Sequence, residues 1–188
     1  EYSGYYRRVE LRIEGGEEHP EQPTDERISS YKQGHPDIGM PALYFNYGRY
    51  LLIASSMHSQ GPANLQGLWN HSLTPPWDCD IHLNINVQMN YWPAEVCDLS
   101  EAVEPLLRYA ERFVPSGREA ARKIYGCLGI VLPQSSDVWC KFHAAQSGWA
   151  VWTGCAAWLG QHFWWKWEYS RDEAFLRNRV YPFLSQVA

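Results

Sequence analysis

The feature that most constrains the fold of this chain is the spacing of its apolar residues, which recur every three or four positions along most of its length. An α-helix turns once in about 3.6 residues, so residues at this spacing share one buried face. Residues 41–54 and 149–169 carry the pattern most clearly. Near the N-terminus, only residues 9–13 alternate as a strand does. The spacing therefore predicts an all-α architecture, with a short lead-in that has room for one strand.

Helix start signals divide the central part of the chain into predicted elements. Pro41 suits a first helical position and predicts a helix of about 14 residues. Pro105 predicts the start of another helix, followed by apolar residues on one face. Ser116 and Glu119 have the spacing of a capping box and predict a separate helix over residues 120–125.

The C-terminal part of the chain is predicted to hold two more helices. The longer one covers residues 149–169 and has an apolar stripe. Ser170 and Glu173 again match a capping box, which predicts that the next helix begins there. Pro182 is expected to interrupt that last helix, because proline lacks the backbone N–H that a helix interior needs.

The chain divides into a lead-in and one helical region. Residues 1–40 combine many charges with glycines and prolines, so we assign them to a lead-in or linker and residues 41–188 to a helical domain. Two long segments, 55–92 and 127–148, connect the predicted helices. Loops of this length in compact domains are usually functional. They favour a helical toroid, in which loops at one end build a cleft, over a short-loop four-helix bundle.

Composition argues against several classes of protein. The formal net charge is −5, and the 16 lysines and arginines are scattered, so no nucleic-acid partner is expected. No apolar run reaches the roughly 20 residues of a membrane span. The five cysteines are an odd number without CxxC spacing, which argues against a zinc site and a complete disulfide framework, and no metal or other cofactor is expected. The chain begins with Glu1 and shows no signal-peptide pattern, so we expect an internal piece of a longer protein whose compartment stays open.

Polar and apolar residues alternate strictly at residues 82–88. If this segment is extended, one face carries the polar side chains and the other the apolar ones. The polar face would hold His82, Asn84, Asn86 and Gln88. Paired carboxamides can hold and orient a water molecule without adding charge. The pattern alone also fits a half-exposed strand whose amides bond to solvent.

Further motifs surround this segment. Residues 62–70 read PANLQGLWN, residues 74–77 read TPPW and residues 90–95 read NYWPAE. In order and spacing these motifs resemble the signature of glycoside hydrolase family 95, the inverting α-L-fucosidases. The similarity extends along about residues 24–188, including the segments 44–56, 116–118 and 157–162.

The resemblance implies an (α/α)6 barrel, of which this chain forms the N-terminal half. The implied enzyme removes terminal α-1,2-linked L-fucose from galactose-containing glycans with inversion, so the partner is a fucosylated oligosaccharide or glycan. Asn84 and Asn86 match the pair that positions and activates the attacking water, and His82 matches a sugar-contacting neighbour. The other substrate contacts are assigned to Asn64, Gln66, Trp69, Trp77, Trp92 and Trp158.

The catalytic carboxylates are expected outside this chain. Inverting hydrolysis needs a carboxylic acid on the leaving oxygen and a carboxylate that activates water. In the family both come well after the asparagine pair, and we therefore expect them beyond residue 188 and assign no catalytic role to Asp80, Glu95 or Asp137. The chain by itself is then expected to be inactive.

Some positions depart from the family pattern. Residues 133–139 read PQSSDVW, where the family usually has two adjacent histidines before an N-T-D-L-W run, and Met57 and His58 also differ. These changes leave open an α-L-galactosidase or a catalytically inactive carbohydrate-binding relative. A metal enzyme is not favoured, because no pair of histidines has HxxH or HExxH spacing. The histidines considered for it are His58, His71, His82, His143 and His162.

Overall fold

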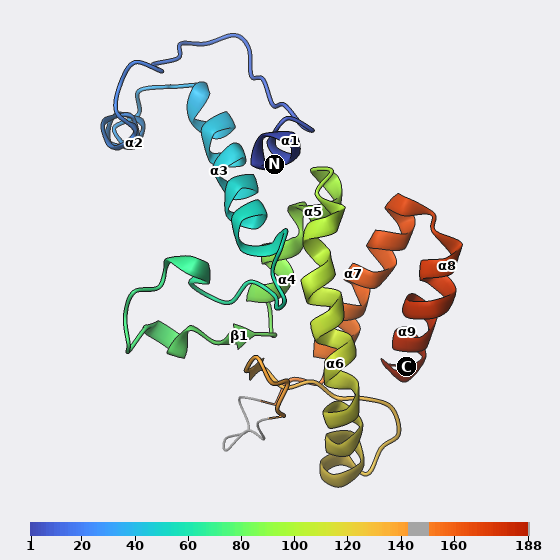
Figure 1. Cartoon of the computed structure of the whole chain (residues 1–188). Coiled ribbons are helices and arrows are strands. Elements are labelled where there is room, and N and C mark those ends of the chain that lie inside the picture. Colours follow the sequence, from blue (N-terminus) through green and yellow to red (C-terminus); the bar gives the residue numbers. More distant parts are fainter. Residues whose placement is uncertain (143–150, 188) are drawn as a thin grey trace.

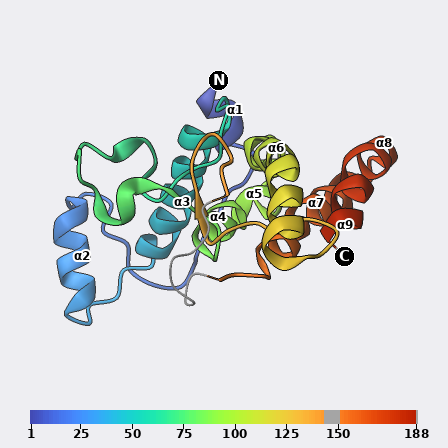
Figure 2. The ribbon, with the colours of Figure 1, turned by 90° about the horizontal axis from the view of Figure 1, so that it is seen from below.

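The computed structural model describes residues 1–142 and 151–187, and most of them are helical (Figure 1). The helices are α1 (Tyr2–Tyr6), α2 (Thr24–Lys32), α3 (Gly39–Ser56), α4 (Asn86–Tyr91), α5 (Pro93–Val96), α6 (Glu104–Ala120), α7 (Cys155–Ser170), α8 (Glu173–Phe175) and α9 (Tyr181–Val187). Shorter 3-10 or π-helical turns are η1 (Gly67–Trp69), η2 (Pro76–Cys79), η3 (Ser100–Val103), η4 (Ala121–Tyr125) and η6 (Leu176–Val180). Two short strands, β1 (Ile81–His82) and β2 (Ser135–Ser136), form an antiparallel pair. Seen from below, α3, α6, α7 and α9 follow one another across the molecule (Figure 2).

Helix α3 is longer than its start signal predicts. It has 18 residues and begins at Gly39, before Pro41. The side chain of Arg49 on α3 is 1% exposed and donates hydrogen bonds to the backbone carbonyls of the lead-in, including that of Val9 at 3.0 Å. Residues 9–13 do not form the strand for which their alternation left room, and the Val9 carbonyl bonds to the Arg49 side chain instead of to a neighbouring strand.

Helix α6 confirms the predicted apolar face but not the predicted break. Its side chains on that face are at most 1% exposed, namely Leu106, Leu107, Ala110 and Phe113. The capping box at Ser116 is wrong, since α6 continues to Ala120 and then through η4. The Ser116 hydroxyl instead donates to the carbonyl of Cys140 at 2.8 Å. The Ser116 hydroxyl, which the local pattern assigned to a helix cap, thus forms a tertiary hydrogen bond instead.

The C-terminal helices also differ in detail from their sequence signals. Helix α7 begins at Cys155, and residues 151–154 before it are not helical. The next helix is capped by Asp172, whose carboxylate accepts from the backbone N–H groups of Ala174 and Phe175, so the capping box at Ser170 is wrong. The chain then stays helical through η6 and α9, and Pro182 lies within the first turn of α9 instead of ending a helix.

The apolar core lies where α5, α6, α7 and α9 meet. Side chains from three of these helices and the connection before α6 are almost fully buried in it, including Leu99, Leu107, Phe113, Phe163 and Phe183. The rings of Phe163 and Phe183 stack 4.3 Å apart and join α7 to α9. No helix in the described part of the chain combines the length and apolarity needed to cross a bilayer.

Candidate substrate site

The segment that carries the strict alternation is a strand end, a turn and a helix start. Strand β1 ends at His82, residues 83–85 form a turn, and α4 starts at Asn86. The extended conformation expected over residues 82–88 is therefore wrong beyond His82. The segment becomes helical because it also carries a second pattern. Leu83, Val87 and Tyr91 are four residues apart, and each side chain is at most 1% exposed. That spacing is helical, and burying these three side chains outweighs the local alternation.

The turn is fixed by hydrogen bonds to both main-chain groups of Leu83. Its N–H donates to the carbonyl of Gln134 at 2.6 Å, and its carbonyl accepts from Gln88 Nε2 at 2.7 Å. The thiol of Cys155, at the start of α7, donates to the same carbonyl at 3.3 Å. Gln88 is fully buried in this way, so it does not share a polar face with Asn84 and Asn86 as the alternation predicted.

Asn84 and Asn86 occupy different backbone environments. Asn84 lies in the turn and is partly buried, and its Oδ1 atom has no hydrogen-bond partner among the described residues. Asn86 lies at the first position of α4 with its side chain exposed. A buried oxygen without a partner costs about 1–3 kcal/mol, so the Oδ1 atom of Asn84 is a natural position for a bound water or hydroxyl group.

His82 is oriented by a carboxylate two residues before it. Its Nδ1 atom is hydrogen-bonded to Asp80 Oδ1, and the pair is largely shielded from solvent, with side-chain exposures of 13% and 26%. A carboxylate only accepts, so Nδ1 carries the hydrogen and Nε2 of a neutral imidazole is left as an acceptor. The ring of Trp77 meets that of His82 edge-on at 5.7 Å and is 68% exposed.

The turn that presents Trp77 has an unusual backbone. Trp77, Asp78 and Cys79 have φ angles of +57°, +57° and +53°, in the left-handed region that non-glycine residues avoid. Asn64 Nδ2 donates to the Cys79 carbonyl at 2.9 Å and Gln66 Nε2 donates to the Pro76 carbonyl at 3.0 Å. The amide N–H groups of these two predicted sugar contacts therefore hold the turn.

The loop that departs from the family pattern lies beside His82. Strand β2 pairs Ser135 with His82 and Ser136 with Ile81. Tyr109 on α6 anchors the same loop by donating its hydroxyl to the Asp137 carbonyl at 2.8 Å. The structure thus brings residues 133–139 next to the segment that holds the asparagine pair, although about fifty residues of sequence separate them.

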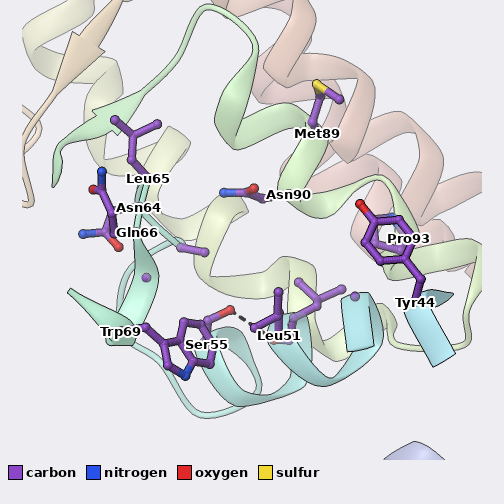
Figure 3. A pocket seen from close by; sticks show the side chains of 14 residues that line it. Tyr44, Leu51, Ser55, Asn64, Leu65, Gln66, Trp69, Met89, Asn90 and Pro93 are labelled. Atoms are coloured by element: carbon purple, nitrogen blue, oxygen red, sulfur yellow. Dashed lines mark hydrogen bonds between the residues drawn. The ribbon is translucent and has the colours of Figure 1, made fainter. Parts of the chain in front are cut away.

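A cavity of about 430 Å³ lies between α3, the loop around residues 63–69 and α4 (Figure 3). Three predicted sugar contacts line it, namely Asn64, Gln66 and Trp69. Asn90 lines it from α4, and in Figure 3 its amide points across the cavity toward the loop. The hydroxyl of Tyr91 holds the walls together, because it bonds to the Ser56 hydroxyl on α3 and accepts from the Ala63 N–H.

The two remaining tryptophans lie at other places. Trp92 is 44% exposed and lines a separate cavity of about 380 Å³ with Trp165 and Tyr169 of α7. Trp158 packs edge-on against Trp152 with ring centroids 6.2 Å apart, one turn after Cys155. The structure therefore groups Asn64, Gln66 and Trp69 around one cavity and sets Trp77, His82 and Asn84 along the neighbouring loop and turn.

Two residues of the site were missed by the sequence reasoning. Asp80 precedes His82 by two positions, a spacing that places both on one face of a strand. Asn90 follows Asn86 by four positions and shares its face of α4, but this becomes visible only once the segment is known to be helical.

Histidine, cysteine and carboxylate side chains do not converge on one point in the described residues. No group of three or more of them there is close enough to hold a metal ion, and His143 lies outside the described residues. His162 is 2% exposed, and burial lowers its pKa to about 4, so it is neutral at physiological pH. Burial raises the pKa of Glu95, which accepts a hydrogen bond from the Ser100 hydroxyl.

A site rich in carboxamides and flanked by tryptophans suits a ligand that carries hydroxyl groups and an apolar face, as sugars do. The model described as "Glycosyl hydrolase family 95 catalytic domain" matches residues 1–188, and the chain belongs to this family. The predicted all-α fold, forming part of a helical barrel, is confirmed with it.

Two relatives with assigned names are similar over nearly the whole chain. "Alpha-L-fucosidase 2" of Arabidopsis thaliana is 40% identical over 190 residues, which cover 98% of this chain and 22% of the relative. "Probable alpha-fucosidase A" of Aspergillus niger is 38% identical over 194 residues, which cover 100% of this chain and 24% of the relative. The chain thus spans less than a quarter of the length of either protein.

Proposed function

We propose that the natural protein containing this chain removes terminal α-1,2-linked L-fucose from galactose-containing glycans with inversion at the anomeric carbon. Both relatives described above are named as fucosidases. The observation that carries the proposal is the junction of β1 and α4, where His82, Asn84 and Asn86 follow one another beside exposed Trp77. This chain contributes one half of an (α/α)6 barrel, residues 41–188, and the general acid and base come from outside it.

The asparagine pair positions the attacking water in this proposal. Asn84 offers a buried amide oxygen that has no partner within residues 1–142 and 151–187, and this oxygen is suited to accept a hydrogen bond from that water. Asn86 offers an exposed amide at the start of α4. Two neutral amides can fix the direction of the water lone pair toward the anomeric carbon without repelling the catalytic carboxylates.

His82 and Trp77 bind the fucose ring in this proposal. Nε2 of His82 accepts a hydrogen bond from a sugar hydroxyl, since Asp80 occupies the other nitrogen. The exposed ring of Trp77 offers a flat apolar surface to the face of the sugar that carries C–H bonds. The left-handed turn held by Asn64 and Gln66 fixes the direction in which this ring points.

The activity is tested with the full-length natural protein and an oligosaccharide that ends in L-fucose α-1,2-linked to galactose. Proton NMR during the first minutes should show release of the β-anomer of L-fucose, as inversion requires. Release of the α-anomer would contradict the mechanism, and binding without hydrolysis would identify an inactive carbohydrate-binding relative. A larger kcat/KM for the matching α-L-galactoside would identify an α-L-galactosidase, and the changed loop at residues 133–139, which pairs with His82, would be the candidate cause.

The 188-residue chain by itself is expected not to release fucose. Losing the general acid and the general base removes roughly 10²–10⁴-fold of rate for each, before any loss of positioning. The measurement compares L-fucose release by the isolated chain and by the full-length protein at equal molar concentration. Hydrolysis by the chain alone would contradict the assignment of the carboxylates to another part of the protein.

Asp80→Asn is expected to weaken sugar binding by about 10-fold in KM, because a charge-assisted hydrogen bond of about 1.5–3 kcal/mol fixes the imidazole of His82. The new amide can donate to Nδ1 and so favour the opposite tautomer. Nitrogen-15 NMR of the histidine ring should report that change directly. Asp78→Asn is the matched control, since Asp78 is exposed on the same turn. Equal effects of the two changes would contradict an orienting role for Asp80.

A further inference from the structure

The cavity of about 380 Å³ beside α7 is lined by a carboxylate and four aromatic rings. Its six lining residues are Tyr91, Trp92, Glu95, Val96, Trp165 and Tyr169. We propose that this cavity binds an organic cation that carries a quaternary ammonium group. The proposal does not depend on the fucosidase activity, because neither the asparagine pair nor His82 lines this cavity.

Two helix faces build the walls of the cavity. Glu95 and Val96 follow Trp92 by three and four positions, and Tyr169 follows Trp165 by four. Residues at these spacings are neighbours on one side of a helix. The side chains of α5 therefore face those of α7 across one space, which has a size that suits a small organic ligand.

His162 holds the aromatic walls in place. Its ring lies edge-on to the ring of Trp165 at 5.1 Å and to the ring of Tyr91 on α4 at 6.5 Å. Because burial keeps His162 neutral at physiological pH, this contact places no positive charge beside the cavity. The position of Trp165 is thus fixed by a group that does not repel a cation.

Among the residues that the structure describes, Glu95 is the one charged group that lines the cavity. Its Oε1 atom accepts a hydrogen bond from the Ser100 hydroxyl at 3.2 Å. The ammonium of Lys166 donates to the carbonyl and the hydroxyl of Ser100, both at 2.9 Å, rather than to the carboxylate. Burial raises the pKa of Glu95 although Lys166 opposes that shift, so the charged carboxylate gains stability when a cation enters the cavity.

The aromatic rings favour a methylated ammonium over a sugar. A cation is attracted to the faces of aromatic rings, and quaternary ammonium groups are commonly bound in this way. A sugar needs hydrogen-bonding partners for several hydroxyl groups, whereas the Tyr91 hydroxyl is already bonded to the Ser56 hydroxyl and the Ala63 N–H. The methyl groups of a quaternary ammonium need no such partners, and its charge is balanced by Glu95.

The test compares two ligands of nearly the same shape on the full-length natural protein. Choline carries the quaternary ammonium, and in its neutral isostere a carbon atom replaces the charged nitrogen. Choline should bind at least about 10-fold more tightly in a titration followed by ligand-observed NMR. Equal binding of the two ligands would identify an apolar pocket without cation selectivity and overturn the proposal, as would the absence of choline binding.

Removing the carboxylate charge tests the role of Glu95. Glu95→Gln keeps the shape of the side chain and an acceptor for Ser100, so choline binding should weaken about 10-fold while binding of the isostere changes less than about two-fold. Glu168→Gln is the matched control at an exposed position on α7 and should leave both ligands unaffected. Equal effects of Glu95→Gln on both ligands would overturn the proposal.

Removing one ring tests the aromatic wall. Trp165→Leu should weaken choline binding about 10-fold. Trp164→Leu is its matched control, because Trp164 is exposed on the same helix and does not line the cavity. Equal effects of the two changes would contradict the assignment.

Two further results separate the cation site from the sugar site. Displacement of bound choline by L-fucose or lactose would assign this cavity to the glycan and overturn the proposal. The comparison of choline with its isostere on the wild type requires no substitution, so it decides the matter even if a variant does not fold. Its outcome is also independent of whether the protein releases fucose.

Discussion

Replacing Asn84 or Asn86 with glycine in the full-length protein is expected to lower kcat by at least about 100-fold, with a much smaller change in KM. A misplacement of about 1 Å between reacting groups costs roughly 10²-fold in rate, or about 2.7 kcal/mol of barrier. Deleting either amide removes a group proposed to hold the water while leaving the sugar contacts of Trp77 and His82 intact. The measurement is steady-state hydrolysis of an α-1,2-fucosylated galactoside.

The control for this pair must account for the flexibility that glycine introduces. Asn178→Gly places the same change at an exposed helical position on η6, where it costs well under the roughly 1 kcal/mol that separates glycine from alanine, without touching the site. Its kcat should equal that of the wild type. If both site variants keep the wild-type kcat and only KM rises, the asparagines bind sugar uniformly in ground and transition states and do not position water.

Replacing Arg49 with methionine is expected to destabilise the protein by about 3 kcal/mol or more, because hydrogen bonds from a charged donor contribute about 1.5–3 kcal/mol each. The buried guanidinium donates to the carbonyls of Tyr6 at 2.9 Å, Val9 at 3.0 Å and Tyr5 at 3.2 Å, and to Asn46 Oδ1 at 3.2 Å. Methionine keeps the length of the side chain but leaves these acceptors without a donor.

Urea unfolding and hydrogen exchange of the amides near residues 5–9 measure this effect. Arg12→Met is the matched control, since Arg12 pairs with Glu10 on the surface with a side-chain exposure of 76%, and ion pairs exposed in this way add little to stability. Arg49→Lys should fall between wild type and Arg49→Met, because one ammonium cannot reach all the acceptors of the guanidinium fork. Equal stability of Arg49→Met and Arg12→Met would show that the lead-in is not held by this residue.

The structure places the predicted site residues in different surroundings, and their roles in the reaction stay predictions. Asn64, Gln66 and Trp69 share a cavity, and Trp77 lies against His82, which agrees with a common substrate site. Trp92 lines a different cavity, so the structure does not group it with these residues. The amide N–H groups of Asn64 and Gln66 hold the turn before Asp80, so substitutions there are expected to act partly through Trp77.

The sequence by itself determined the helical class, the main helices and the family. Apolar spacing is a local property, and the long helices α3, α6 and α7 bury the faces that this spacing marks. The motifs between residues 62 and 95 identified the family because their order and spacing can be read from the sequence without knowing the fold.

Only the tertiary structure decided the conformation of the site. Residues 82–88 carry a strand pattern and a helical pattern at once, and contacts distant in sequence selected the helix. Leu83 is held by Gln134 and by the thiol of Cys155, which follow it by 51 and 72 residues. At Ser116 the partner was again remote, since its hydroxyl bonds to Cys140 rather than to a helix end. Local patterns indicate which side chains are buried. Packing between helices decides which residues cover those side chains and form hydrogen bonds with them.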